Sequence, residues 1–180
     1  MPAPDLDAWL PEPVVRTRHR REAASDPQTL WHAAEGVRLR DTRTLGRMVR
    51  WRIPGVAADT TFRDLFRAYP FCVLEEGESW SVSGLVGRIW TIERDYPRLG
   101  GPEDFRAWDE PGTVRVLMAN WVQDAGNGRS ALVSEARVGP TNRRAEVRLR
   151  ALWAVVGGFE RLIGGEALES VVRRADAGSA

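Results

Sequence analysis

The chain has 180 residues, 43% of them hydrophobic and 28% charged, a composition typical of one globular domain that buries roughly 70% of its unfolded surface. Its 26 basic residues, all arginine, nearly balance 25 acidic ones, and the net charge of +1 excludes a strong overall field that would attract nucleic acid or anionic lipid. A single cysteine, Cys72, excludes an intrachain disulfide and a cysteine zinc site, and two histidines argue against a multi-histidine metal centre.

The N-terminal stretch, residues 1–13, contains four prolines and three acids, so we expect no signal peptide there. No run in the chain approaches the length of about 18 apolar residues that a membrane span needs, and a cytoplasmic location is the default expectation. We interpret residues 1–13 as an extended arm anchored by Trp9 and Leu10. Residues 14–175 are expected to form a single domain, and residues 176–180 a disordered tail.

The first half of the domain is expected to form one strand and three short helices. The strand candidate Val14–Ala24 is crowded with arginine. The sequence Ser25-Asp26-Pro27 offers a capping oxygen followed by proline at the first helical position, which predicts a helix start. The expected helices cover residues 27–35, 42–52 and 61–68.

From Phe71 onward the apolar period changes to that of strands, which are divided by turns rich in glycine and proline. The expected strands cover residues 71–74, 80–90, 105–108, 113–123 and 130–138. Connections this short favour antiparallel neighbours.

After Pro140, apolar residues recur at three- and four-residue steps to about Arg174, which predicts a long amphipathic helix. Gly157-Gly158 lies inside it and predicts either a helix break or a kink. The helix needs a large apolar surface, and the sheet is the only candidate. We therefore predict an α+β, helix-grip fold, in which a curved antiparallel sheet wraps around a long C-terminal helix and leaves an apolar cavity.

The order of these elements and several short motifs resembles the START-like or SRPBCC superfamily, which includes polyketide cyclases and lipid-transport proteins, and in detail a bacterial branch of it. The motifs that carry the resemblance are Leu10-Pro11-Glu12, His19 through Pro27, Trp31, Gly84 to Trp90, Glu110-Pro111-Gly112, Ser134 to Val138, Arg148 and Leu152-Trp153. The resemblance implies a cavity between sheet and helix that holds a hydrophobic small molecule. It does not imply one chemistry, because this fold hosts many.

Glu135 and Arg137 are expected on the same face of one strand. In one interpretation they form a solvated charge ladder with Arg88 or Arg115, worth about 0.2–1 kcal/mol per pair. In the other they lie inside the cavity, where burial forces them to pair and the guanidinium orients a carboxylate or enolate of a ligand.

Three tryptophans, Trp90, Trp121 and Trp153, are either core residues or flat walls of the cavity with an indole N–H as polar handle. Asn120 is a strand amide that needs partners if it is buried, and a ligand is one source of them. His19 is expected at the surface, since a role as general base requires an orienting acid within reach.

Nucleic-acid binding is not favoured, because the basic run Arg16 to Arg21 divides its charges between two strand faces and has no interleaved aromatic residue. No phosphate-binding glycine loop and no hydrolase motif is present, so we expect no cofactor and no metal.

Three hypotheses follow for function. The first is a carrier or sensor of a hydrophobic, aromatic or acyl small molecule. Its expected ligand-binding residues are Arg88, Trp90, Asn120, Trp121, Glu135, Arg137 and Trp153. The second is an aromatase/cyclase-like enzyme that requires Glu135, Arg137, Arg88 and Asn120 to converge on one cavity. The third is a protein-interaction module that uses the arm or the basic strand, and a homodimer is left open.

Overall fold

The structure is a computed structural model that describes residues 3–53, 55–91 and 96–178. One antiparallel sheet has the strand order β1-β5-β4-β3-β2. The strands are β1 (Val15–Ala23), β2 (Cys72–Gly77), β3 (Trp80–Gly87), β4 (Val114–Gly126) and β5 (Arg129–Pro140). The α-helices are α1 (Pro27–Gly36), α2 (Thr44–Arg52), α3 (Phe62–Arg67), α4 (Pro102–Ala107) and α5 (Arg143–Gly178), with a short 3-10 turn at Leu39–Asp41.

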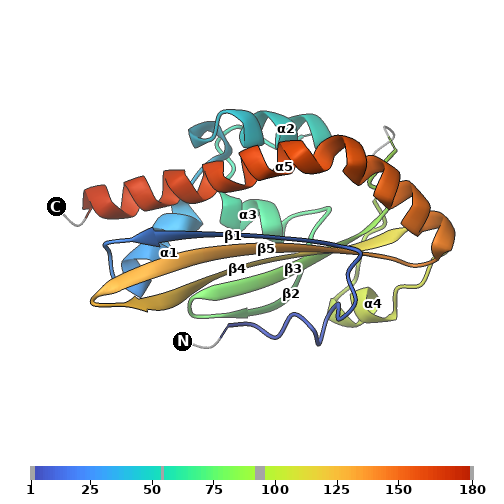
Figure 1. Ribbon diagram of the computed structural model, residues 1–180, viewed down its shortest axis with the longest axis horizontal. Coiled ribbons are helices and arrows are strands. Elements are labelled where there is room, and N and C mark those ends of the chain that lie inside the picture. Colours follow the sequence, from blue (N-terminus) through green and yellow to red (C-terminus); the bar gives the residue numbers. More distant parts are fainter. Residues whose placement is uncertain (1–2, 54, 92–95, 179–180) are drawn as a thin grey trace.

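The long helix α5 runs over one side of the sheet together with α2 and α3, while the N-terminal segment and α4 lie on the other side (Figure 1). The predicted helix-grip architecture is therefore confirmed. Helix α5 is continuous through Gly157-Gly158 and Gly164-Gly165, so the glycine pairs do not divide it into shorter helices. Its ribbon bends as it leaves β5 and passes over the sheet (Figure 1). Within the described residues, no helix is long and apolar enough to cross a bilayer.

The strand predicted at residues 105–108 is wrong, because Phe105 to Ala107 form the last turn of helix α4 and Trp108 follows its end. Pro102 occupies the first helical turn, and Glu103 and Asp104 lie where the helix dipole favours negative charge. The buried ring of Phe105 packs over Gly84, where a Cβ atom would lie only 2.6 Å from the ring. The segment therefore contributes one buried aromatic side chain, through which α4 packs against the sheet.

Strand β3 is shorter than the predicted 80–90 segment. It ends at Gly87, whose φ of 134° is a conformation that side-chain-bearing residues rarely adopt. Arg88 and Trp90 therefore lie beyond the end of the strand. The alternation of strand side chains between the two faces of the sheet does not determine where they point.

The two faces of the sheet carry different residues. On β4, Leu117, Ala119 and Trp121 belong to a buried cluster with Leu6, Trp9 and Leu10 of the N-terminal segment. The intervening residues Met118 and Asn120 face α5 and the short helices. The expected anchors Trp9 and Leu10 are confirmed as buried, at 4% and 2% exposure.

Candidate functional site

A cavity of about 570 Å³ lies between the α5 side of the sheet and the helices. Its helical walls are largely apolar. They include Trp31 and Ala34 of α1, Leu45, Met48 and Val49 of α2, Phe62, Leu65 and Phe66 of α3, and Trp153, Val155, Ala167, Leu168 and Val171 of α5. The volume falls in the range of about 300–1,000 Å³ that small-molecule sites occupy.

Polar side chains cross the sheet side of the cavity in a single line, which we call the floor row. The strand registers pair Glu76 with Ser81, Ser81 with Asn120, Asn120 with Ser134, and Ser134 with His19. All five residues line the cavity, one from each strand. Residues directly opposite one another in antiparallel strands have Cβ atoms about 4.5–5.5 Å apart. The floor row therefore places hydroxyl, amide and imidazole groups side by side beneath apolar walls.

The neighbouring row is less polar; it lies two residues along β1, β3, β4 and β5, and three along β2, where the register shifts between Val73 and Glu75. It consists of Val73, Ser83, Met118, Ala136 and Thr17, which also line the cavity. The polar groups of the sheet side are thus concentrated on the floor row.

The charged side chains of the described cavity lining form two ion pairs. Arg63 lies 3.4 Å from Glu35, and Arg67 lies 2.5 Å from Glu76. The four side chains retain 21–46% exposure, so these pairs belong to the solvent-facing edge of the cavity. Because each of these carboxylates has its own guanidinium partner, the two ion pairs add no net charge to the described lining.

Of the predicted site residues, Asn120 and Trp153 line this cavity. Asn120 is half-buried and central in the floor row. Among the described residues, no protein group hydrogen-bonds to its side-chain amide. Such an amide offers two donors and an acceptor to a molecule in the cavity.

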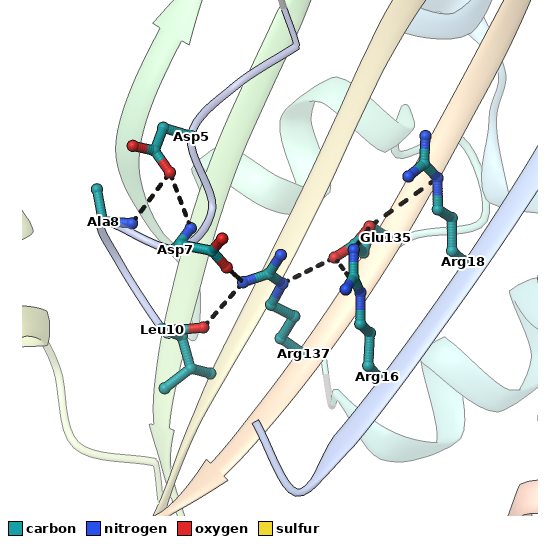
Figure 2. Close-up of polar contacts among 8 residues, drawn as sticks. All are labelled: Asp5, Asp7, Ala8, Leu10, Arg16, Arg18, Glu135 and Arg137. Carbon is teal, nitrogen blue, oxygen red and sulfur yellow. Dashed lines mark hydrogen bonds and ion pairs between the residues drawn. The ribbon is translucent and has the colours of Figure 1, made fainter. Parts of the chain in front are cut away.

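Glu135 and Arg137 lie on the opposite face of the sheet, under the N-terminal segment (Figure 2). The Arg137 Nε donates to Glu135 Oε1 over 2.7 Å, and its Nη1 donates to the Asp7 carboxylate over 2.5 Å and to the Leu10 carbonyl over 2.9 Å. Arg16 of β1 approaches Glu135 within 2.8 Å. The interpretation that places both residues in the cavity is therefore wrong, because strand alternation sends them away from Ser134 and Ala136. The alternative of a solvated ladder is wrong as well, because the Glu135 and Arg137 side chains are only 1% and 6% exposed.

The predicted ladder partners are corrected as well. Glu135 is paired with Arg16, Arg18 and Arg137 rather than with Arg88 or Arg115, because β5 is flanked by β1 on one side. Burial lowers the pKa of the Arg137 guanidinium, but hydrogen bonds to Asp7 and Glu135 outweigh it and leave the pKa above its ordinary value. The same hydrogen bond holds the pKa of the Asp7 carboxyl below its usual range. This network fastens the arm to the sheet.

The remaining predicted residues also lie outside the cavity. Trp121 is buried on the arm side, with the Arg18 guanidinium 5.1 Å from its ring centroid. Trp90 packs beside the start of α5 in a cluster with Val114 and Leu149. Arg88 lies at a separate shallow pocket near the start of α5 and is 3.8 Å from Glu110.

Sequence reasoning missed most of the floor row. His19, expected at the surface, is half-buried and lines the cavity opposite Ser134. Ser81, Ser134 and Glu76 were not singled out as ligand-binding. Only Ser81 lies between two apolar residues in the sequence, and it is the strand register that brings the three residues into line.

Comparisons with known proteins give similarity at the level of the fold. No family model matches the chain, and no curated protein matches it. The crystal structure of TTHA0849 from Thermus thermophilus is 11% identical with a TM-score of 0.38, over 92% of this chain and 100% of that one. The ZhuI aromatase/cyclase from a Streptomyces species is 11% identical with a TM-score of 0.38, over 92% and 96%. Ara h 8.0201 is 8% identical with a TM-score of 0.25, over 89% and 97%.

Proposed function

We propose that this protein binds a hydrophobic small molecule, aromatic or acyl in character, in the cavity between the sheet and α5, and acts as its carrier or sensor. The observation that carries the proposal is the floor row beneath apolar walls, in a cavity of about 570 Å³. Few polar groups converging in a large apolar pocket are typical of ligand sites. With this role we also propose membership of the START-like superfamily.

The floor row suggests which hydrophobic molecules fit best. A purely hydrocarbon ligand would cover Asn120, Ser81 and Ser134 without replacing the hydrogen bonds that water provides, which costs about 1–3 kcal/mol for each buried unsatisfied group. A ligand with carbonyl or hydroxyl groups along one edge avoids this cost. The apolar walls then cover the rest of the molecule.

The cyclase-like alternative loses its original support, because only Asn120 among its four expected polar residues lines the cavity. One observation favours an enzyme as the second candidate. His19, whose imidazole is the side chain most often used in general acid–base catalysis, faces the same cavity opposite Ser134. A His19→Gln variant that binds ligand normally but loses turnover would favour the enzyme over the carrier.

Native mass spectrometry of protein purified from its source tests the binding proposal. We expect a bound apolar molecule whose occupancy falls in Asn120→Leu. The matched control is Gln123→Leu, the same amide-to-alkyl change on the same strand but outside the cavity lining. Equal occupancy in the two variants would count against the floor row as the binding surface.

A further inference from the structure

Charge is distributed unevenly over the cavity lining. The three central strands, β3, β4 and β5, contribute only uncharged side chains to it, and their polar members are Ser81, Ser83, Asn120 and Ser134. The charged residues Glu135 and Arg137 of β5 lie on the opposite face, under the N-terminal segment (Figure 2). The centre of the sheet therefore offers hydroxyl and amide groups, but no ion, to a molecule in the cavity.

The guanidinium and carboxylate groups of the described lining lie at its solvent-facing edge and pair with one another. Arg67, the last residue of α3, donates from Nη2 to Glu76 Oε2 over 2.5 Å. Arg63 lies 3.4 Å from Glu35. His19, at the other end of the floor row from Glu76, also has an interaction within the protein. None of the four charged groups is therefore left over to pair with the charge of a ligand.

A carboxylate on a ligand finds no favourable position in such a lining. Against the central strands it accepts hydrogen bonds from neutral groups alone, and burying a carboxylate without a cation costs far more than such hydrogen bonds return. Beside Arg67 it has to displace Glu76, which then loses its own partner. An alcohol, ketone, ester or amide meets neither cost, because serine and asparagine side chains both donate to and accept from neutral oxygens.

The Arg67–Glu76 pair lies closer to the floor row than the Arg63–Glu35 pair does. Glu76 is itself a member of the row, directly opposite Ser81 in the strand register. Its carboxylate therefore holds the Arg67 guanidinium at the end of a line of neutral hydrogen-bonding groups. Without that carboxylate, the same line would end in an unpaired cation.

We propose that the cavity selects uncharged oxygen-bearing ligands over carboxylic acids of the same size, and that Glu76 is a specificity-determining residue because it occupies Arg67. The selectivity rests on the proposed function, since it presupposes that the cavity binds a hydrophobic molecule. It narrows the ligand class to alcohols, ketones, esters and amides with an apolar body.

Displacement of the neutral fluorescent probe N-phenyl-1-naphthylamine by n-decanol and by decanoate tests the proposal, at about pH 8, where a carboxylic acid is ionised. In the wild type, n-decanol should displace the probe at a concentration lower by roughly tenfold or more. Decanoate also enters any apolar site less readily than n-decanol, so the decisive comparison is between variants of the protein. Glu76→Gln should bind decanoate about tenfold more tightly than the wild type does, because Arg67 is then free to pair with it, and n-decanol equally well.

Two further variants separate the pairing from other effects of the substitution. Arg67→Gln/Glu76→Gln removes both charges and should return the affinity for decanoate to that of the wild type. Glu103→Gln makes the same change in an exposed pair with Arg106 outside the described lining, and should alter neither affinity. Thermal unfolding followed by circular dichroism checks that each variant is folded.

The outcomes distinguish this proposal from the one on which it rests. The selectivity is refuted if the wild type binds the probe but binds decanoate as tightly as n-decanol. It is refuted equally if a folded Glu76→Gln gains no affinity for decanoate, or if the double variant gains as much as the single one. Failure of the wild type to bind the probe would refute the proposed function, and the selectivity with it.

Discussion

Replacing Glu135 with alanine removes the centre of the buried charge network under the arm. The Glu135 side chain is 1% exposed and accepts hydrogen bonds from Arg137 Nε at 2.7 Å and from Arg16 Nη2 at 3.2 Å. Arg137, at 6% exposure, would then keep only Asp7 and the Leu10 carbonyl as partners. The substitution leaves a guanidinium buried with less compensation.

The expected loss of stability follows from these partners. Breaking a buried ion pair typically costs about 3–5 kcal/mol, because the remaining charge stays desolvated. Arg16 and the second partner Arg18 are about half exposed and recover water, and Arg137 retains Asp7. We therefore expect the lower end, about 3 kcal/mol in the free energy of unfolding. For a chain of this size the melting temperature falls by roughly 6–12 °C.

Urea unfolding followed by tryptophan fluorescence measures this loss. The matched control is Glu103→Ala, which removes an exposed carboxylate paired with Arg106 at 2.7 Å and should cost less than about 1 kcal/mol. The affinity of the cavity for a fluorescent apolar probe should not change in Glu135→Ala, since Glu135 faces away from the cavity. A loss no larger than that of Glu103→Ala, or a selective loss of probe binding, would refute this assignment of faces.

Two further predictions concern other parts of the fold. Gly84→Ala should lower the free energy of unfolding by about 1–3 kcal/mol in a urea titration, because its Cβ would lie 2.6 Å from the ring of Phe105; an unchanged midpoint would contradict the packing. Burial raises the pKa of the Glu166 carboxyl, but the hydrogen bonds from the three backbone N–H groups at the start of α2 outweigh burial and leave the pKa below its ordinary value. The stability it provides is therefore present above its ordinary pKa and lost as the pH falls through the lowered value. After correction for intrinsic exchange rates, hydrogen exchange of the amides at the start of α2 should accelerate in acid in the wild type. In Glu166→Ala the same amides should exchange fast already at neutral pH. Exchange that does not depend on pH in the wild type would contradict this.

Much of the fold followed from periodicity. The alternation of β4 and β5 and the three- and four-residue steps of α5 reflect burial on one side, which a sequence expresses directly. The prediction of a strand at residues 105–108 failed because the pattern of only four residues does not distinguish a strand from a short helix with one buried ring.

The site depended on a feature that periodicity does not contain. The turn at Asn127-Gly128 has positive φ at both residues and pairs Gly126 with Arg129. Continued without interruption, that register would set Asn120 opposite Glu135. A one-residue shift between Asp124 and Gly126 instead sets Asn120 opposite Ser134 and sends Glu135 to the other face. The prediction that grouped Asn120 with Glu135 and Arg137 failed at this irregularity.

Filling the cavity from its floor tests the central claim most directly. In a titration with the neutral fluorescent probe N-phenyl-1-naphthylamine, we expect the wild type to bind and Met118→Trp, which projects an indole into the cavity, to lose roughly tenfold or more in affinity. Gln123→Trp, on the same strand but outside the lining, should bind as the wild type does. Absence of binding in the wild type, or equal affinity in a folded Met118→Trp protein, would contradict a ligand site between the sheet and α5.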